Sequence, residues 1–400
     1  MPKLLWVSPL SVHDTSSSSA TQMRNMLLSL KARDAEIVGL SALNFVHERG
    51  TSMFTDLEDK LKGEDTSFNL NDNNINFIYI RTKSRHLGDM ISQEQRNFYA
   101  KFCALINAFR PDVVMGSGSD MLSMVCFDEA HRRDIPTVYT LLDGTPERFN
   151  FPNIDVIVTD SSATANLYAT NRKINSVVVG SFLPVTAPNM STELPERKRI
   201  TMVNPTLDNG LGVFAALARL QALKLSDYQF TVCELYEGQF KEQMALINPA
   251  YSEQDLQAIE VLPPNTSLSQ VLLESKVLVT PSLAFESSLN IARDAIAHGV
   301  AVLGTNQTGI AEVIGDAGVL VELPAHVIEQ RTSPIADSDM GNFIKGLEII
   351  LANDFSEKCA NVTKRYDINY SANRLVMVLK PLFDKRAGNN PQLLRNGSLI

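Results

Sequence analysis

The 400-residue sequence contains few cysteines and no apolar run long enough to cross a membrane. The apolar start, residues 4–7, is too short for a signal peptide or a membrane span. The four cysteines are scattered and lack C-x-x-C spacing, which argues against a zinc site or a disulfide framework and favours a reducing compartment. These cysteines are Cys103, Cys126, Cys233 and Cys359. We therefore expect a cytoplasmic protein, with the inner face of the membrane as a further location.

Excess positive charge is also lacking, because 36 basic residues face 45 acidic ones and the net charge is −9. Without a basic stripe, a nucleic-acid partner is disfavoured. The sequence has no G-x-S-x-G elbow and no H-E-x-x-H motif, so protease chemistry is unsupported, and we expect no metal site. Gly116-Ser117-Gly118 lacks the third glycine of a dinucleotide fingerprint and indicates a turn.

What is present is a regular alternation of strand-like and helix-like segments. A chain of this length exceeds the usual size of one hydrophobic core, so two domains are expected. In the first half, strands are predicted at 4–8, 35–40, 75–80, 112–115, 137–142, 155–159 and 176–179, and helices at 20–30, 93–109 and 121–133. Strands that alternate with helices predict an α/β fold with a doubly wound, largely parallel sheet.

The alternation stops at residues 184–198, where Pro184, Pro188 and Pro195 indicate a linker. It then restarts with strands at 200–203, 229–233, 277–280, 301–304 and 319–321, and helices at 212–223, 268–274 and 289–298. The second half is thus a second α/β domain. Residues 340–385 have a helical pattern, in which Pro381 argues against one uninterrupted final helix. Residues 387–400 are expected to be a flexible tail.

The stretch from Val277 to Gly299 carries the most specific chemical pattern. It predicts a buried strand, a turn after Pro281 and then a helix. Glu286 falls just before this helix and Asp294 falls in its early turns, so both can face a ligand above the strand ends. The free backbone N–H groups at such a helix start, with the helix dipole, suit a phosphate group.

This spacing resembles the family-4 retaining glycosyltransferases of the GT-B fold (glycosyl transferases group 1). Their signature is a Pro-Ser turn, a carboxylate, seven residues, and a second carboxylate followed by Ala-x-Ala. Glu286 and Asp294 occupy the two acidic positions, and Ala295 and Ala297 follow them. The similarity continues through residues 299–303 and 309–321, so about 45 residues match in order and spacing, which is far more specific than a lone glycine motif.

The resemblance implies two Rossmann-like domains facing across a cleft. Residues 1–183 would be the acceptor-side domain, 184–198 the linker and 199–370 the nucleotide-sugar-binding domain, with 371–386 packing back on the first domain. Glu286 would contact the donor sugar near the reacting carbon, and Asp294 the ribose hydroxyls. The remaining donor-side residues that the resemblance implies are Ser287, Ser288, Leu289, Thr308, Gly309 and Glu312.

At several positions the sequence differs from the family pattern. Asn204 and Asn209 stand where an Arg and a Lys usually hold the donor diphosphate, and an amide cannot neutralise a phosphate. The usual His-Asp pair of the first domain reads Leu142-Asp143, which leaves Asp143 beside Glu286 as a catalytic candidate. A serine run that includes Ser16 and Ser17 replaces the glycine pair of the first loop, and Leu289 replaces a common glycine.

His13 and Asp14 lie in the same first loop and are acceptor-side candidates, although loop polarity explains them equally well. The resemblance implies transfer of a hexose from a UDP- or GDP-sugar to a glycan, lipid or protein acceptor with retention, without a metal or cofactor. Peripheral membrane association is a further expectation, and the oligomeric state is open. Two alternatives remain: a catalytically reduced partner subunit of another transferase, motivated by the missing basic pair, and a sugar-nucleotide epimerase or hydrolase.

Overall fold

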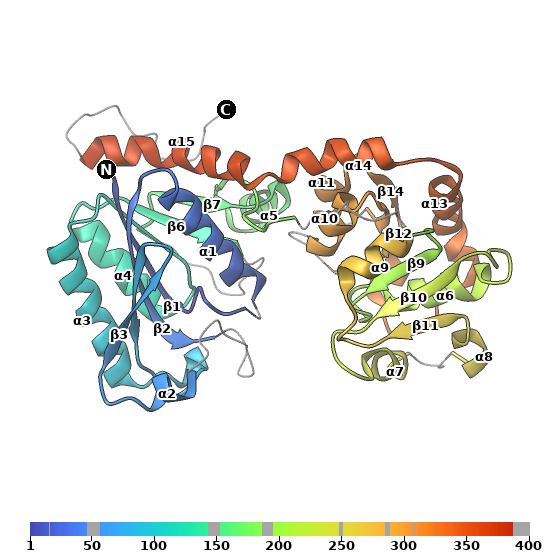
Figure 1. Cartoon of the computed structure of the whole chain (residues 1–400), viewed down its shortest axis with the longest axis horizontal. Coiled ribbons are helices and arrows are strands. Elements are labelled where there is room, and N and C mark those ends of the chain that lie inside the picture. The colour runs from blue at the N-terminus through green and yellow to red at the C-terminus, as the bar shows by residue number, and fades with distance from the viewer. Residues whose placement is uncertain are drawn as a thin grey trace. The chain divides into compact units, whose positions relative to one another are not determined.

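The computed structural model describes residues 1–15, 17–45, 57–142, 153–185, 195–247, 251–284, 289–306 and 309–386. The chain divides into two compact units. Unit 1 comprises Met1–Leu183 together with Ile368–Ile400, and unit 2 comprises Pro184–Asp367. Both units are α/β, each built on its own sheet (Figure 1). No helix within the described ranges is long and apolar enough to cross a membrane.

The sheet of unit 1 has the strand order β3-β4-β2-β1-β5-β6-β7-β8. Its strands are β1 Lys3–Leu10, β2 Glu36–Asn44, β3 Ser67–Asp72, β4 Ile75–Ile80, β5 Val113–Gly116, β6 Thr137–Leu141, β7 Val156–Thr159 and β8 Val177–Val178. Each neighbouring pair is parallel except β3 and β4, which form an antiparallel hairpin. Strand β3 was not predicted from the sequence, because this polar edge strand lacks the apolar pattern of a core strand.

Helices cover both faces of this sheet, as a parallel sheet requires. They are α1 Ser18–Lys31, α2 Leu57–Lys62, α3 Ser92–Phe109, α4 Met121–Arg132, α5 Ser162–Arg172 and α15 Ile368–Arg386, with a 3₁₀ turn η1 at Leu87–Asp89. Side chains of β1 alternate between two cores: Leu4 and Trp6 pack with α1 and α15, whereas Leu5 and Val7 pack with α3 and α4. This two-residue period is the one that a central strand must have.

Unit 2 contains a fully parallel sheet with the order β11-β10-β9-β12-β13-β14. Its strands are β9 Arg199–Val203, β10 Gln229–Cys233, β11 Ile259–Leu262, β12 Ser275–Thr280, β13 Ala301–Thr305 and β14 Gly318–Val321. Its helices are α6 Leu211–Gln221, α7 Gln239–Met244, α8 Glu253–Leu256, α9 Leu268–Glu274, α10 Asn290–Ala297, α11 Ile310–Ile314, α12 Ala325–Glu329, α13 Gly341–Ala352 and α14 Ser356–Thr363, with 3₁₀ turns η2 Asp337–Met340 and η3 Lys364–Tyr366. The short strand β11 was not predicted from the sequence.

The last helix, α15, belongs to unit 1 although it follows unit 2 in the sequence. Its inward face adds Ala372, Leu375, Leu379 and Leu382 to the core that α1 covers. The expectation of a break at Pro381 was wrong, because α15 continues through this residue to Arg386. A proline lacks the backbone N–H that would donate to the carbonyl four residues earlier, so α15 lacks one internal hydrogen bond at this point.

This placement predicts different costs for two substitutions two residues apart on α15. Leu375 is fully buried and Met377 is 68% exposed. Leu375→Ala should lower the free energy of unfolding of unit 1 by about 2–5 kcal/mol through the cavity it leaves. Met377→Ala should change it by no more than about 0.5 kcal/mol. Urea unfolding followed by the fluorescence of Trp6, the single tryptophan of the chain, measures both; equal effects would contradict the packing of α15 on unit 1.

Candidate functional site

The candidate site of unit 2 lies where the strand order changes direction. From β9 the chain proceeds to β10 on one side, whereas from β12 it proceeds to β13 on the other, and β9 and β12 are neighbours. In open α/β sheets, ligands bind beyond the carboxyl ends of the strands at such a switch point. The loops that flank this point are residues 204–210 after β9 and, within the described ranges, residues 281–284 after β12 and 289 before α10.

The loop after β9 is held together by the two asparagines that replace the expected basic pair. Asn204 adopts a left-handed backbone (φ 57°), which asparagine tolerates better than most residues. Its backbone carbonyl accepts a hydrogen bond from Asn209 Nδ2 at 2.8 Å, and its side-chain oxygen accepts one from Gln239 Nε2 at 2.7 Å. Both amides therefore shape the loop, and neither brings positive charge to it.

The two loops at the switch point are joined to each other directly. Gly210, which precedes α6 with φ 82°, packs so closely on Pro281 that a Cβ atom there would lie 2.0 Å from the proline carbonyl oxygen. The backbone N–H of Leu283 donates to the carbonyl of Asp208 at 2.8 Å. The guanidinium of Arg331 pairs with the Asp208 carboxylate and donates to the carbonyl of Leu283 at 3.1 Å. Residues from three parts of the sequence thus fix one edge of the site.

Helix α10 starts at this edge and carries one of the predicted donor residues. It begins at Asn290, and Leu289 is its N-cap. Asp294 is partly exposed and lies one turn after Asn290 on the same helix face. Because helical side chains lean toward the N-terminus, the carboxylate of Asp294 leans toward the carboxyl edge of the sheet. The Oδ1 atom of Asn290 is buried and has no hydrogen-bond partner among the described residues.

The opposite end of α10 is held firmly. Arg197 donates to the backbone carbonyls of His298 and Gly299, both at 2.6 Å. The buried ring of His298 bridges the carbonyl of Asp294 (2.7 Å) and the hydroxyl of Ser269 (2.8 Å). Burial lowers the pKa of Arg197 from its usual value, but the side chain stays charged because arginine is effectively always protonated. These contacts fix the helix axis and therefore the position of its N-terminal turn.

The next strand, β13, places two more predicted residues beside this edge. Gly309 precedes α11 with φ 96°, a conformation that favours glycine. Glu312 lies exposed in the first turn of α11. The carboxyl ends of β9, β12 and β13, which are neighbours, thus bring together the loops that carry Asn204, Leu289 and Gly309. Six predicted residues lie outside the described ranges: Ser16, Asp143, Glu286, Ser287, Ser288 and Thr308.

Arg331 was not among the site residues predicted from the sequence. It follows α12, beyond the block that resembles the glycosyltransferase signature, so no motif pointed to it. Its side chain is 35% exposed, and it brings a guanidinium to an edge where asparagines replace the expected cations. Among the described residues, no group of three or more His, Cys, Asp or Glu side chains is placed to hold a metal ion.

In unit 1, the predicted acceptor-side residue His13 is almost fully buried. Its Nε2 lies 3.0 Å from the Asp72 carboxylate, and its Nδ1 lies 2.6 Å from the Tyr79 hydroxyl. Arg24 binds the same carboxylate with two hydrogen bonds of 2.6 and 2.9 Å, and Ser11 lies 2.9 Å from the Tyr79 hydroxyl. Since an ionised carboxylate only accepts, His13 donates from Nε2 and accepts from Tyr79 at Nδ1.

Burial lowers the pKa of His13, although Asp72 acts in the opposite direction. Burial alone would raise the pKa of Asp72, but hydrogen bonds from Arg24 and His13 outweigh it and lower that pKa. Asp14 is also buried, and Ser17 caps α1 by accepting from the N–H of Ala20 at 3.2 Å. His13, Asp14 and Ser17 therefore belong to the framework of the first loop, and direct contact with an acceptor stays a prediction.

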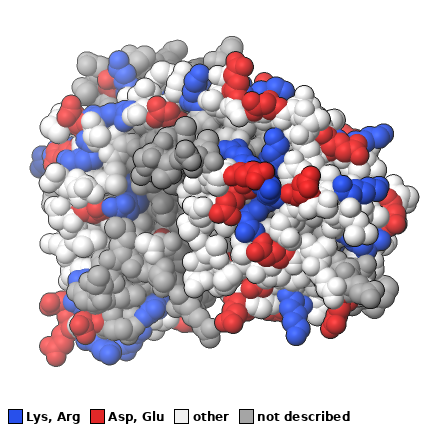
Figure 2. Space-filling view, turned by 45° about the vertical axis from the view of Figure 1, so that its right-hand side comes forward, with Lys and Arg blue, Asp and Glu red and all other residues white. Residues whose placement is uncertain are grey.

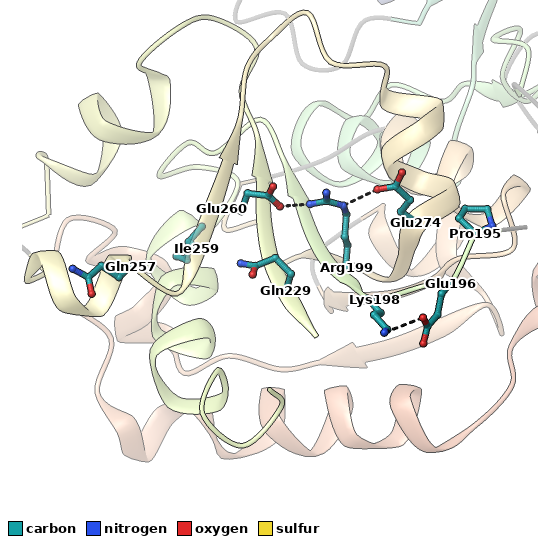
Figure 3. Close-up of a pocket in the computed structure, with 9 residues that line it drawn as sticks. All are labelled: Pro195, Glu196, Lys198, Arg199, Gln229, Gln257, Ile259, Glu260 and Glu274. Atoms are coloured by element: carbon teal, nitrogen blue, oxygen red, sulfur yellow. Dashed lines mark hydrogen bonds and ion pairs between the residues drawn. The ribbon is translucent and has the colours of Figure 1, made fainter. Parts of the chain in front are cut away.

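A cavity of about 600 Å³ opens at the opposite, amino-terminal edge of the unit 2 sheet (Figure 3). Arg199 in its wall is bound by Glu260 and by Glu274, the latter at 3.0 Å, and Lys198 pairs with Glu196 at 2.9 Å. None of the predicted site residues lines this cavity, and its cations are all paired. On the face shown in Figure 2, basic and acidic side chains are likewise interspersed.

Solved structures with this fold cover nearly the whole chain. A glycosyltransferase from Rickettsia africae matches with a TM-score of 0.63 and 14% identity over 97% of this chain and 99% of its own. The trehalose-6-phosphate protein of E. coli bound with UDP-2-fluoro glucose matches with a TM-score of 0.60 and 13% identity over 94% of this chain and 99% of its own. The pneumococcal O-GlcNAc transferase GtfA, in complex with UDP and GlcNAc, matches with a TM-score of 0.59 and 10% identity over 95% of this chain and 99% of its own.

Comparisons with protein-family models and with curated proteins found no match. The two α/β units, with their largely parallel sheets, and the structural matches show that the chain has the GT-B fold of glycosyltransferases, which confirms the predicted fold class. At identities of 10–14%, the similarity extends to the fold alone.

The junction between the two loops predicts a cost for Gly210→Ala that a matched glycine does not share. Gly238 also precedes a helix with positive φ (81°), but a Cβ atom there meets nothing within 4 Å. Gly238→Ala should lower the free energy of unfolding by roughly 1–2 kcal/mol through backbone strain. Gly210→Ala should cost roughly 1–3 kcal/mol more, because it also separates Pro281 from the loop. Equal costs in urea unfolding would show that the loops are not in contact.

The buried His13 predicts that acid destabilises unit 1 in a defined pH range. The pKa of His13 in the folded protein lies below its ordinary value of 6.5, so the unfolded chain binds the proton more readily. The contribution of neutral His13 to the free energy of unfolding should be fully present above about pH 6.5. It should be lost as the pH decreases toward the pKa of His13 in the folded protein. The lowered pKa of Asp72 acts in the same direction, but only below its ordinary value of 3.8.

Urea unfolding midpoints at pH 7.5 and 5.5 measure this effect. His13→Gln should reduce the difference between the two midpoints. The exposed His86 serves as a control, and His86→Gln should leave the midpoint difference unchanged. If the midpoint difference in both variants were as large as in the wild type, the assignment to His13 would be contradicted.

Proposed function

We propose that the chain transfers a hexose from a UDP- or GDP-sugar to a glycan, lipid or protein acceptor, with retention at the anomeric carbon. The proposal rests on the pair of joined loops at the β9–β12 switch point. Helix α10, which contains Asp294, begins beside these loops. Two similar structures contain UDP or a UDP sugar, which supports a nucleotide-sugar donor. Both the acceptor and the retention of configuration are part of the proposal.

In the proposed reaction, an acceptor oxygen forms a bond to the anomeric carbon while the bond from that carbon to the diphosphate breaks. The acceptor proton leaves with the diphosphate, whose negative charge the site must stabilise. We assign Asp294 to the ribose hydroxyls and Glu286 to the donor sugar, and the amides at the start of α10 to the diphosphate. Asp143, which lies outside the described residues, stays a catalytic candidate beside Glu286. This assignment requires no metal ion.

Arg331 is the cation that we assign to the donor diphosphate. Its guanidinium already lies against both switch-point loops through Asp208 and the carbonyl of Leu283. The carboxylate of Asp208 is 65% exposed, so the pair is accessible to solvent and a phosphate can compete for the guanidinium. A charge-assisted hydrogen bond is roughly twice as strong as a neutral one. Arg331 can form such a bond to a phosphate, whereas the neutral amides of Asn204 and Asn209 cannot supply the positive charge.

The alternative function is a catalytically reduced partner subunit of another transferase. It is favoured by Asn204 and Asn209, whose side chains hold their own loop together where the family has cations. Calorimetric titration of the full chain with UDP-glucose, UDP-GlcNAc and GDP-mannose discriminates the two. Binding of one donor, followed by sugar transfer to an acceptor, supports the enzyme; release of free or epimerised sugar without an acceptor would indicate a hydrolase or an epimerase. Absence of binding to every donor would favour the partner subunit.

Replacing Arg331 should weaken nucleotide binding specifically. Arg331→Gln should raise the dissociation constant for UDP by about tenfold at low salt, and the difference should shrink as salt screens the charge. Arg219 provides a matched control, because it forms a similar ion pair with Asp337 and lies near the end of α6, away from the carboxyl edge. Arg219→Gln should leave the constant unchanged. Equal affinities in the wild type and Arg331→Gln would remove Arg331 from the site.

A further inference from the structure

Charge is distributed unevenly along the chain, and the unevenness is concentrated in its last segment. Residues 368–400 contain five basic side chains and one acidic one, a net charge of +4, although the whole chain has a net charge of −9. The basic residues are Arg374, Lys380, Lys385, Arg386 and Arg395, and the acidic residue is Asp384. The described part of this segment is helix α15.

Helix α15 combines these charges with large exposed apolar side chains. Its inward face is buried in the core of unit 1, whereas Tyr370 and Met377 on its outward face are 64% and 68% exposed. Arg374 and Lys380 are exposed beside them. The spacing of residues 370, 374 and 377 places these side chains on one stripe of the helix.

The neighbouring helix α1 contributes a further cation to this stripe. Arg33, which follows α1, donates to the side-chain oxygens of Asn369 and Asn373 at 3.0 and 3.1 Å. These acceptors are neutral. No carboxylate within the described ranges forms an ion pair with Arg33, Arg374 or Lys380. The stripe therefore keeps its positive charge.

A small apolar cavity opens between α15, α1 and the start of β1. Its volume is about 180 Å³, and its walls include Leu4, Leu30, Leu379 and Phe383, with Arg33 and Lys380 among the lining residues. It is smaller than the roughly 300–1,000 Å³ typical of pockets for whole small-molecule ligands. Its size suits one apolar chain end, next to two cations.

We propose that Tyr370, Arg374, Met377, Lys380 and Arg33, the α15 patch, dock unit 1 on an anionic lipid bilayer. Unpaired cations on an amphipathic helix match the phosphates of acidic lipids. Tyrosine and methionine suit the boundary between headgroups and acyl chains, because each presents apolar surface without a charge to desolvate. The adjacent cavity suits the end of a lipid acyl chain. An inorganic anion has no such apolar group, so the cavity favours a lipid as the occupant. Neither the donor nor the acceptor enters this argument.

The test measures sedimentation of the full chain with vesicles of phosphatidylcholine alone or with added phosphatidylglycerol. The wild type should bind only the anionic vesicles and should dissociate at high salt. Arg374→Glu/Lys380→Glu should weaken binding by about tenfold or more, since each cation contributes to the attraction. Tyr370→Ser/Met377→Ser should weaken binding at all salt concentrations.

The matched control is Lys83→Glu/Arg96→Glu, which changes the net charge equally at exposed positions elsewhere on unit 1. It should bind within about twofold of the wild type, and unchanged urea midpoints of all variants exclude misfolding. An equal loss in the control would overturn the proposal, because net charge rather than the α15 patch would then drive binding. Absence of binding to anionic vesicles, or association of the chain with itself through this patch, would also overturn it. Donor titrations are independent of this result, so either proposal can fail alone.

Discussion

The contact between Gly210 and Pro281 is the constraint on which the candidate site depends. A β9–α6 loop and a β12–α10 loop can form one binding edge only if they approach each other at the point where the strand order reverses. The absence of a side chain at residue 210 allows this approach, and the Leu283–Asp208 hydrogen bond and the Arg331–Asp208 ion pair reinforce it. At the other end of α10, Arg197 binds the carbonyls of His298 and Gly299, which directly follow the helix. The C-terminal end of the helix that carries Asp294 is thus fixed by the fold of unit 2.

The two asparagines illustrate how the chain differs from the family it resembles. Where the family has cations that face the diphosphate, Asn204 and Asn209 face their own loop and Gln239. The asparagines therefore hold the shape of this edge, and we propose that Arg331, from a different part of the sequence, supplies its positive charge. In unit 1, polar side chains likewise hold a loop in shape, because His13 and Asp72 bind each other beside the first loop. In both units these polar side chains hold loops of the fold in shape.

Most of the fold could be predicted from the sequence, because its central strands are apolar runs flanked by helices of clear period. Residues 4–8 and 277–280 are examples, and both lie in the structure as buried central strands. The polar edge strand at 67–72 and the short strand at 259–262 were missed, since neither has a core-facing pattern over enough residues. Continuation of α15 through Pro381 was also missed, because the packing of α15 on the core of unit 1 is a tertiary effect that overrides local helix propensity.

For the site, local spacing identified the loops but not the contacts between distant segments. Arg331 lies 48 residues after Leu283 in the hydrogen bond that joins them, and nothing in the local sequence indicates this pairing. The burial of His13 depended on Asp72 and Tyr79, which reach it from a hairpin that the sequence did not reveal. Such contacts arise from the packing of the sheet, and a motif cannot encode them.

Hydrogen–deuterium exchange of the full chain with and without UDP tests the central claim most directly. Bound UDP should slow exchange of the amides in residues 204–210 and 289–294, which flank the β9–β12 switch point at the carboxyl edge of the unit 2 sheet. Protection confined to residues 195–199 and 257–260, around the cavity at the amino-terminal edge, would contradict the account. So would an exchange pattern that saturating UDP leaves unchanged.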